Sequence, residues 1–129
     1  MNTDSRKTVL IVEDNDKNMK LARDVLEAKG YAVLAATNGE DGVRLATEQL
    51  PDLVLMDIQM QGIDGVEALR RLRAESRTAS IPVAAFTASV TAGDRSRVTQ
   101  AGFDAFVSKP VNLKEFIATV QRLSGRDES

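Results

Sequence analysis

The sequence has 129 residues, a length typical of one domain with one sizeable hydrophobic core. Its formal net charge of -2 excludes a broad basic field for nucleic acid or an anionic membrane, and it contains neither an apolar signal core nor a membrane-length apolar run. Because cysteine and histidine are both absent, disulfides, thiol chemistry, a Ser-His-Asp centre and a phosphohistidine on this chain are excluded, and we expect a cytoplasmic location.

The first predicted strand, 8–12, is followed by helical spacing over 15–29. Gly30 is expected to stop this helix, whose apolar face contains Leu21, Ala22, Val25 and Leu26. A second strand at 31–36 leads into a second helix at 39–49. The apolar stripe of that helix contains Val43, Ala46 and Leu50.

The rest of the chain continues the alternation of strands and helices. Further strands are expected at 52–56, 81–86 and 104–108. The helices that follow them are expected at 65–75, 91–101 and 113–123. Asn112 is the expected N-cap of the last helix. The helix at 91–101 has few apolar residues and contains Gly93, so we expect it to be loosely held.

This order of elements predicts an α/β fold, with a parallel sheet covered by helices on both faces. The predicted strands are almost continuously apolar, which agrees with burial of both faces of the sheet. We expect one domain over 7–123, a disordered N-terminus at 1–6 and a flexible tail at 124–129.

Groups suited to phosphate or metal chemistry follow four of the five predicted strands. Glu13 and Asp14 follow the first strand, and Asp57 follows the third. Thr87 follows the fourth strand, and Ser108-Lys109-Pro110 ends the fifth. Ligands of open parallel sheets bind outside the carboxyl ends of the strands. These groups are therefore expected to meet at one edge, if the first and third strands are neighbours.

Taken singly, each group has an ordinary structural interpretation. An acid after a strand is most often a helix cap or part of a solvated turn, and a Lys-Pro pair is usually a loop. Their joint placement favours function, because two carboxylates about 5 Å apart repel by roughly 3 kcal/mol at an effective dielectric of about 20. Three carboxylates held together need a compensating cation. Oxygen ligands of this kind suit Mg²⁺, which also binds phosphate oxygens.

Four segments carry a resemblance to a known family: VLIVEDN at 9–15, LVLMDIQMQGIDG at 53–65, FTA at 86–88 and SKP at 108–110. With them, the chain over about residues 7–123 resembles the receiver domains of bacterial two-component response regulators. The resemblance implies a flavodoxin-like (βα)5 fold with strand order 2-1-3-4-5. It also implies a signalling switch rather than an enzyme, which catalyses only its own phosphorylation and slow dephosphorylation.

The resemblance assigns roles to individual residues. Asp57 matches the phosphoacceptor, which takes a phosphoryl group from a phosphohistidine of a histidine kinase or histidine phosphotransfer protein. Mg²⁺ or Mn²⁺ would be bound by Glu13 through water, by Asp14, by Asp57 and by the backbone carbonyl of Gln59. The phosphoryl oxygens would contact Thr87 and Lys109.

The resemblance also concerns the response to phosphorylation. Thr87 and Phe106 match the two switch positions, and the Lys109–Pro110 bond matches one that is cis in the family. A downstream protein is expected to dock on the face formed by 91–123. No output domain, nucleic acid or membrane partner is expected.

Other functions are open on the same architecture. A hydrolase of the aspartyl-phosphate type would need an acid two residues after the nucleophile, where this chain has Gln59. A flavin-binding module is disfavoured because Glu13 and Asp14 would repel the flavin phosphate. A phosphorylation-independent adaptor and a receiver segment of a hybrid kinase both agree with the residues. The stretch VEDNDKNMKLARDVLEAKGY is similar to the stand-alone DivK-type receivers of cell-cycle and polarity phosphorelays.

Overall fold

The computed structural model describes residues 6–58, 60, 62–87, 96, 100–108 and 112–125. The elements in chain order are β1 (Thr8–Val12), α1 (Asp16–Ala28), β2 (Ala32–Ala36), α2 (Gly39–Gln49), β3 (Leu53–Asp57), α3 (Gly65–Ala74), β4 (Val83–Thr87), β5 (Ala105–Ser108) and α5 (Leu113–Ser124). The predicted helix at 91–101 lies largely outside the described residues, and its described residues 96, 100 and 101 are helical.

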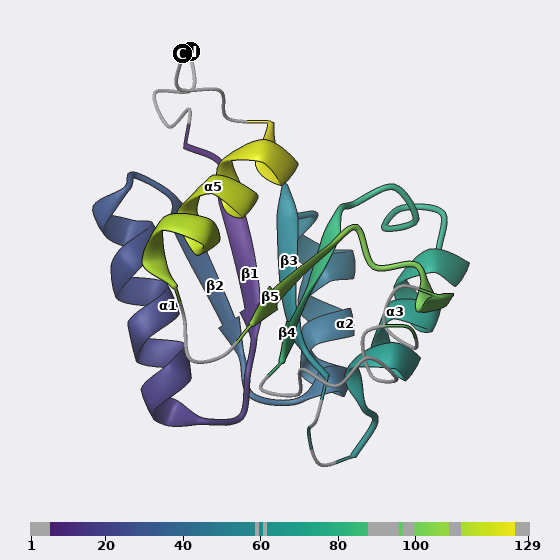
Figure 1. Cartoon of the computed structure of the whole chain (residues 1–129). Coiled ribbons are helices and arrows are strands. Elements are labelled where there is room, and N and C mark those ends of the chain that lie inside the picture. Colours follow the sequence, from purple (N-terminus) through teal and green to yellow (C-terminus); the bar gives the residue numbers. More distant parts are fainter. Residues whose placement is uncertain are drawn as a thin grey trace.

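The strands form one parallel sheet in the order β2-β1-β3-β4-β5 (Figure 1). This confirms both the predicted α/β class and the strand order that the resemblance implied. In register, Val12 of β1 lies opposite Met56 of β3, and Asp57 lies opposite Phe86 of β4. The carboxyl ends of these three strands are therefore adjacent at one edge of the sheet.

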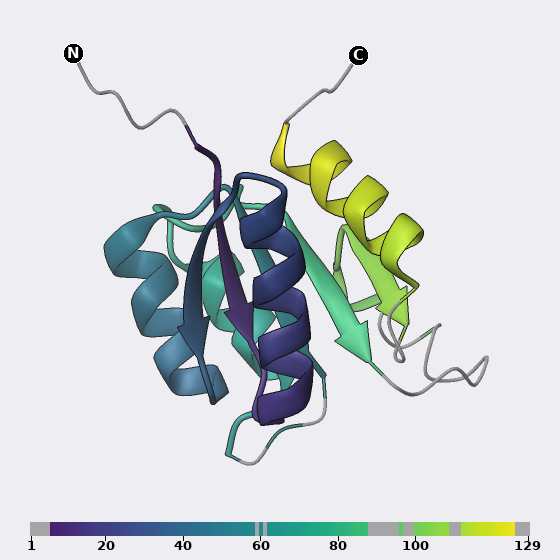
Figure 2. The same cartoon turned by 90° about the vertical axis from the view of Figure 1, so that its left-hand side faces the viewer.

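Helices cover both faces of the sheet, with α1 and α5 on one side and α2 and α3 on the other (Figure 2). Alternate residues of β1 divide between these two layers. Val9 and Ile11 belong to the core cluster that includes residues of α1 and α5. Leu10 and Val12 belong to the cluster that includes residues of α2 and α3. Both faces of β1 are thus buried under helices, which explains its unbroken apolar sequence.

Within the described residues, α5 is attached to the rest of the domain near both of its ends. The rings of Phe86 on β4 and Phe116 on α5 stack with their centroids 6.1 Å apart. At the other end of the helix, the hydroxyls of Tyr31 and Ser124 form a buried hydrogen bond of 3.2 Å. Phe116 and Val120 are fully buried, so the packing of α5 rests mainly on apolar contact.

Polar caps fix where the helices begin. The side chains of Asn15, Asn38, Asp64 and Asn112 each accept a hydrogen bond from the backbone N–H three residues later, which confirms the predicted cap at Asn112. Gly30 follows α1 with a φ of 90°, as its predicted role as a helix stop requires. No helix among the described residues has the length and apolarity needed to cross a membrane.

Two apolar side chains that were predicted to face the core are exposed instead. Leu21 is 42% exposed, because the buried stripe of α1 passes through Met19, Ala22 and Leu26 and leaves Leu21 on the flank. Leu50 is 45% exposed, because it follows the last turn of α2 in a left-handed conformation and no longer continues the helical stripe. In addition, β4 begins at Val83 rather than at residue 81, after a proline that has no N–H to donate.

Candidate functional site

Three carboxylates converge where β1 and β3 end. Glu13 and Asp14 directly follow β1, and Asp57 is the last residue of β3, the strand that pairs with β1. One carboxylate oxygen from each of these residues lies within 4.8 Å of the others. The convergence predicted from the strand ends is therefore present in the folded chain.

The three acids differ in their access to solvent. Glu13 is 1% exposed and Asp57 is 4% exposed, whereas Asp14 is an exposed residue. The backbone N–H of Asn15 donates to Oε2 of Glu13 over 3.5 Å, so the turn that caps α1 also holds the buried acid. The site thus has two acids set into the protein and one at its surface.

This donor set fits a hard divalent cation. At 4.8 Å, two unit charges repel by roughly 3 kcal/mol at an effective dielectric of about 20, and three carboxylates make three such pairs. Carboxylate oxygens are the ligands that Mg²⁺ and Mn²⁺ prefer, and Mg²⁺ typically takes one or two carboxylates and keeps several waters. The exposed side of the cluster at Asp14 leaves room for those waters.

The other predicted site residues are only partly within the described chain. Thr87 is the last residue of β4, one position beyond Phe86, which lies opposite Asp57. Thr87 therefore ends its strand at the same edge as the acids. Gln59, Lys109 and Pro110 lie outside the described residues, so the carbonyl ligand, the phosphoryl contact and the cis peptide bond remain predictions.

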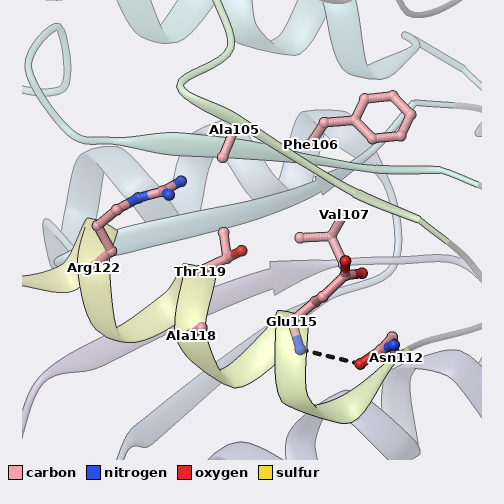
Figure 3. Close-up of a pocket in the computed structure, with 8 residues that line it drawn as sticks. All are labelled: Ala105, Phe106, Val107, Asn112, Glu115, Ala118, Thr119 and Arg122. Atoms are coloured by element: carbon pink, nitrogen blue, oxygen red, sulfur yellow. Dashed lines mark hydrogen bonds between the residues drawn. The ribbon is translucent and has the colours of Figure 1, made fainter.

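Phe106 lies on β5 opposite Ala85 of β4 and is half-buried. It lines a cavity of about 380 Å³ between β5 and α5 (Figure 3). The other lining residues are Ala105, Val107, Asn112, Glu115, Ala118, Thr119 and Arg122. Figure 3 shows Glu115 nearer the start of α5 and Arg122 nearer its end, so the cavity has an acid on one side and a base on the other.

Sequence reasoning missed two contributors to the site. The N–H of Asn15 holds Glu13, and Gly65, the first residue of α3, donates its N–H to the carbonyl of Ile58 over 3.0 Å. The second contact folds the start of α3 back onto the residue that follows Asp57. An Asp-Gly pair at the expected start of a helix was the available signal for this contact.

Comparison with known proteins agrees with this geometry. The family model of the response regulator receiver domain matches residues 9–121. The polar-differentiation response regulator DivK of Brucella anthropi is 44% identical over 119 residues, which cover 92% of this chain and 97% of that protein. The protein of the same name in Brucella ovis is 43% identical over equal shares of the two chains.

Solved structures give the same result. The receiver domain of a sensor histidine kinase from Pseudomonas aeruginosa PAO1, which has a magnesium ion coordinated in its active site cleft, is 34% identical with a TM-score of 0.87, and the match covers 94% of this chain and 99% of that one. A receiver domain of a histidine kinase from Syntrophus aciditrophicus is 31% identical with a TM-score of 0.85, over 95% and 94% of the two chains. The chain therefore belongs to the response regulator receiver domain family of two-component signalling.

Proposed function

We propose that this receiver domain accepts a phosphoryl group on Asp57 from a phosphohistidine of a partner protein, and that this change alters its binding to a second protein. The observation that carries the proposal is the convergence of Glu13, Asp14 and Asp57 within 4.8 Å at the carboxyl edge of the sheet. A cluster of this charge suits a site that binds a divalent cation together with a phosphoryl group.

Asp57 is the nucleophile of the proposed reaction. One of its carboxylate oxygens forms a bond to phosphorus, the P–N bond of the phosphohistidine breaks, and the electron pair of that bond stays on the imidazole nitrogen. Asp57 suits this role because it is 4% exposed and fixed by a buried strand, which holds its carboxylate in one place.

The remaining site residues reduce the repulsion between this carboxylate and the anionic phosphoryl group. A bound Mg²⁺ or Mn²⁺ would neutralise charge and coordinate phosphoryl oxygens, with ligands from Asp14, Asp57, the carbonyl of Gln59 and, through water, Glu13. Thr87 and Lys109 contact the phosphoryl oxygens in this proposal, and Lys109 adds a positive charge. The self-catalysed transfer and the slow self-dephosphorylation use these same groups.

Two exposed leucines support a docking surface for the phosphohistidine partner. Leu21 on α1 is 42% exposed and Leu113 on α5 is 48% exposed. Both helices cover the same face of the sheet and begin near its carboxyl edge, where the acidic site lies. The proposed partner, a histidine kinase or a histidine phosphotransfer protein, covers these leucines while presenting its phosphohistidine to Asp57.

The proposed downstream protein docks on the face formed by 91–123. The described part of this face contains the cavity between β5 and α5, where Phe106 lies between apolar and charged groups. Thr87 and Phe106 are the proposed switch residues, because β4 and β5 pair directly and Thr87 lies opposite Ser108 in register. We propose that the phosphoryl transfer and the binding of the downstream protein both take place in the cytoplasm.

A second candidate is the receiver segment of a hybrid kinase. It is supported by the similarity to receiver domains of histidine kinases from Pseudomonas aeruginosa and Syntrophus aciditrophicus, at 34% and 31% identity. The chemistry at Asp57 is the same in both candidates. Phosphotransfer profiling against the phosphorylated kinases and phosphotransfer proteins of the host separates them, because a hybrid kinase segment receives phosphate fastest from its own kinase.

The experiment that tests the proposed function is phosphorylation by acetyl phosphate with Mg²⁺, followed by intact mass measurement. One phosphoryl group is expected, labile to hydroxylamine as an acyl phosphate is. Asp57→Asn abolishes it, whereas the matched variant Asp16→Asn, which changes an exposed acid in the first turn of α1, retains it. Phosphoryl label retained on the Asp57→Asn variant would contradict the assignment.

A further inference from the structure

A short loop joins Asp57 to α3, and the helix begins by turning back onto it. The N–H of Gly65 donates to the carbonyl of Ile58 over 3.0 Å. Asp64, the residue before it, caps the helix by accepting the N–H of Glu67 over 2.9 Å. The first turn of α3 is thus fixed against the peptide that follows the acidic site.

No side chain fits at position 65. A Cβ built on Gly65 would lie 2.4 Å from the backbone oxygen of Asp57 and 2.9 Å from the Cα of Ile58. Both obstacles are backbone atoms, which cannot turn aside as a side chain can. Asp57 is also held by its pairing with Phe86 in a fully buried part of the sheet. A side chain at this position therefore requires the peptide between Asp57 and Ile58 to move, or α3 to move away from it.

Two other helical glycines are also tightly packed, but the atoms that a Cβ would meet first there are of another kind. A Cβ on Gly42 would first meet the side chain of Val12, at 2.7 Å, and one on Gly39 would first meet the side chain of Ile63, at 2.6 Å. The first obstacle at these two positions is thus a side-chain atom, whereas both obstacles at position 65 are backbone atoms. Gly65 also has no positive φ, so its need for glycine is spatial rather than conformational. An alanine there would otherwise favour the helix by up to about 1 kcal/mol.

We propose that Gly65 is a positioning residue for Asp57: its missing side chain lets α3 pack on the Asp57 peptide, and this packing sets the direction of the Asp57 carboxylate toward Glu13 and Asp14. The inference rests on the proposed phosphorylation of Asp57. Its physical basis is that reactive groups must be held closely, since a displacement of about 1 Å costs about a hundredfold in rate.

The main test measures phosphorylation of Gly65→Ala by acetyl phosphate over a range of Mg²⁺ concentrations, with Gly42→Ala as the matched variant. Both add one methyl to a helical glycine. For Gly65→Ala, the maximal rate at saturating Mg²⁺ is expected to fall by about tenfold or more. For Gly42→Ala, the maximal rate stays within about twofold of the wild type. Each rate is measured well below the melting temperature of its variant and divided by the folded fraction, so that loss of stability alone does not lower it.

A second pair of variants tests the same contact without a steric clash, and it serves if Gly65→Ala does not fold. Asp64→Ala removes the cap that fixes the first turn of α3, and Asn38→Ala removes the equivalent cap of α2, where Asn38 accepts the N–H of Asp41 over 2.8 Å. Both lose a similar stability, but only Asp64→Ala is expected to lower the maximal rate of phosphorylation. Equal rates in these two variants would overturn the inference.

The outcomes separate this inference from the proposed function. If the wild-type protein takes no phosphoryl group, the proposed function fails. If the wild type is phosphorylated and Gly65→Ala reaches the same maximal rate, the proposed function stands and the positioning role of Gly65 is wrong. A loss of rate in Gly65→Ala that Gly42→Ala shares equally also overturns that role.

Discussion

The two edges of the sheet use the same residue type in opposite ways. At the amino edge, Asp52 precedes β3 and accepts the N–H of Thr8, the first residue of β1, over 2.8 Å. Asp104 precedes β5 and accepts both the N–H of Val83, at 2.8 Å, and the guanidinium of Arg73, at 2.9 Å. These carboxylates face donors and join the beginnings of neighbouring strands.

At the carboxyl edge, by contrast, acids also lie beside other acids. One carboxylate oxygen from each of Glu13, Asp14 and Asp57 lies within 4.8 Å of the others, so their negative charges repel. The comparison shows that acids beside the strands meet hydrogen-bond donors at one edge and other acids at the opposite edge. We expect acids at the amino edge to stabilise the fold, and those at the carboxyl edge to destabilise it until a cation binds.

The largest expected effect is the stabilisation of the fold by a cation bound to the acids of the carboxyl edge. Mg²⁺ at 100 times its dissociation constant should raise the free energy of unfolding by about 2.7 kcal/mol, since the folded state alone presents the assembled ligands. Urea unfolding in EDTA and in Mg²⁺ measures the difference. Asp52→Asn should keep the full Mg²⁺ response, and Asp14→Asn should reduce it. Identical unfolding curves with and without Mg²⁺ would count against the metal site.

The next effect concerns the amino edge. Asp104→Ala should lower the free energy of unfolding by about 2 kcal/mol, because the buried N–H of Val83 loses its acceptor and Arg73 loses its counter-charge. Asp24→Ala, which removes an exposed ion pair with Lys20 on α1, should cost less than about 0.5 kcal/mol. Phosphorylation of Asp57 should survive both changes. Equal costs for the two variants would show that Asp104 is no more than a surface acid.

Removal of an acid at the carboxyl edge is expected to have a smaller effect on the free energy of unfolding, and one of opposite sign. In EDTA, Asp57→Asn should raise the free energy of unfolding by about 1 kcal/mol, because it removes two of the three repulsive pairs, partly screened by solvent near Asp14. In saturating Mg²⁺ the same variant should be less stable than the wild type, since it lacks a ligand. Urea unfolding under both conditions measures the two signs. A loss of stability in EDTA would mean that the acids at this edge do not repel as the comparison requires.

The smallest effect comes from a carboxylate at neither edge. On α3, Arg70 and Arg71 hydrogen-bond to Glu67 and lower the pKa of its carboxyl group from 4.5 to about 2. Because the folded pKa lies below the unfolded value, the resulting stability is present above about pH 4.5 and is lost as the pH falls toward 2. A ¹³C titration of the Glu67 carboxyl measures its pKa. In Arg70→Ala the pKa should return toward 4.5, and an unchanged pKa would show that Arg70 is not its main cause.

Much of this arrangement is readable from sequence, because it depends on local periodicity and on one rule of topology. The predicted first strand and second helix have the observed bounds, at Thr8–Val12 and Gly39–Gln49. The meeting of Glu13, Asp14 and Asp57 follows from the rule that the carboxyl ends of parallel strands share one edge. Family resemblance then supplied the strand order that makes β1 and β3 neighbours.

What escaped prediction depends on three-dimensional contacts that leave little trace in sequence. Asp52 and Asp104 have the same local surroundings as many turn acids, and their partners, Thr8 and Arg73, lie 44 and 31 residues away in sequence. The exposure of Leu21 depends on which face of α1 packs against the sheet. Apolar residues lie on more than one face of this helix, so the sequence alone does not decide between them. The demand for glycine at position 65 arises from the backbone oxygen of Asp57, which no periodicity can locate.

The stacked rings of Phe86 and Phe116 have a mechanical consequence. Phe86 lies opposite Asp57 on the neighbouring strand, and Phe116 closes the first turn of α5, the turn that also contains Glu115 of the cavity wall. Because the two rings are fully buried and closely packed, a change in the position of Phe86 would have to be accommodated by the first turn of α5. The ring pair therefore forms a continuous packed path from the strand beside the acidic site to the helix beside the cavity.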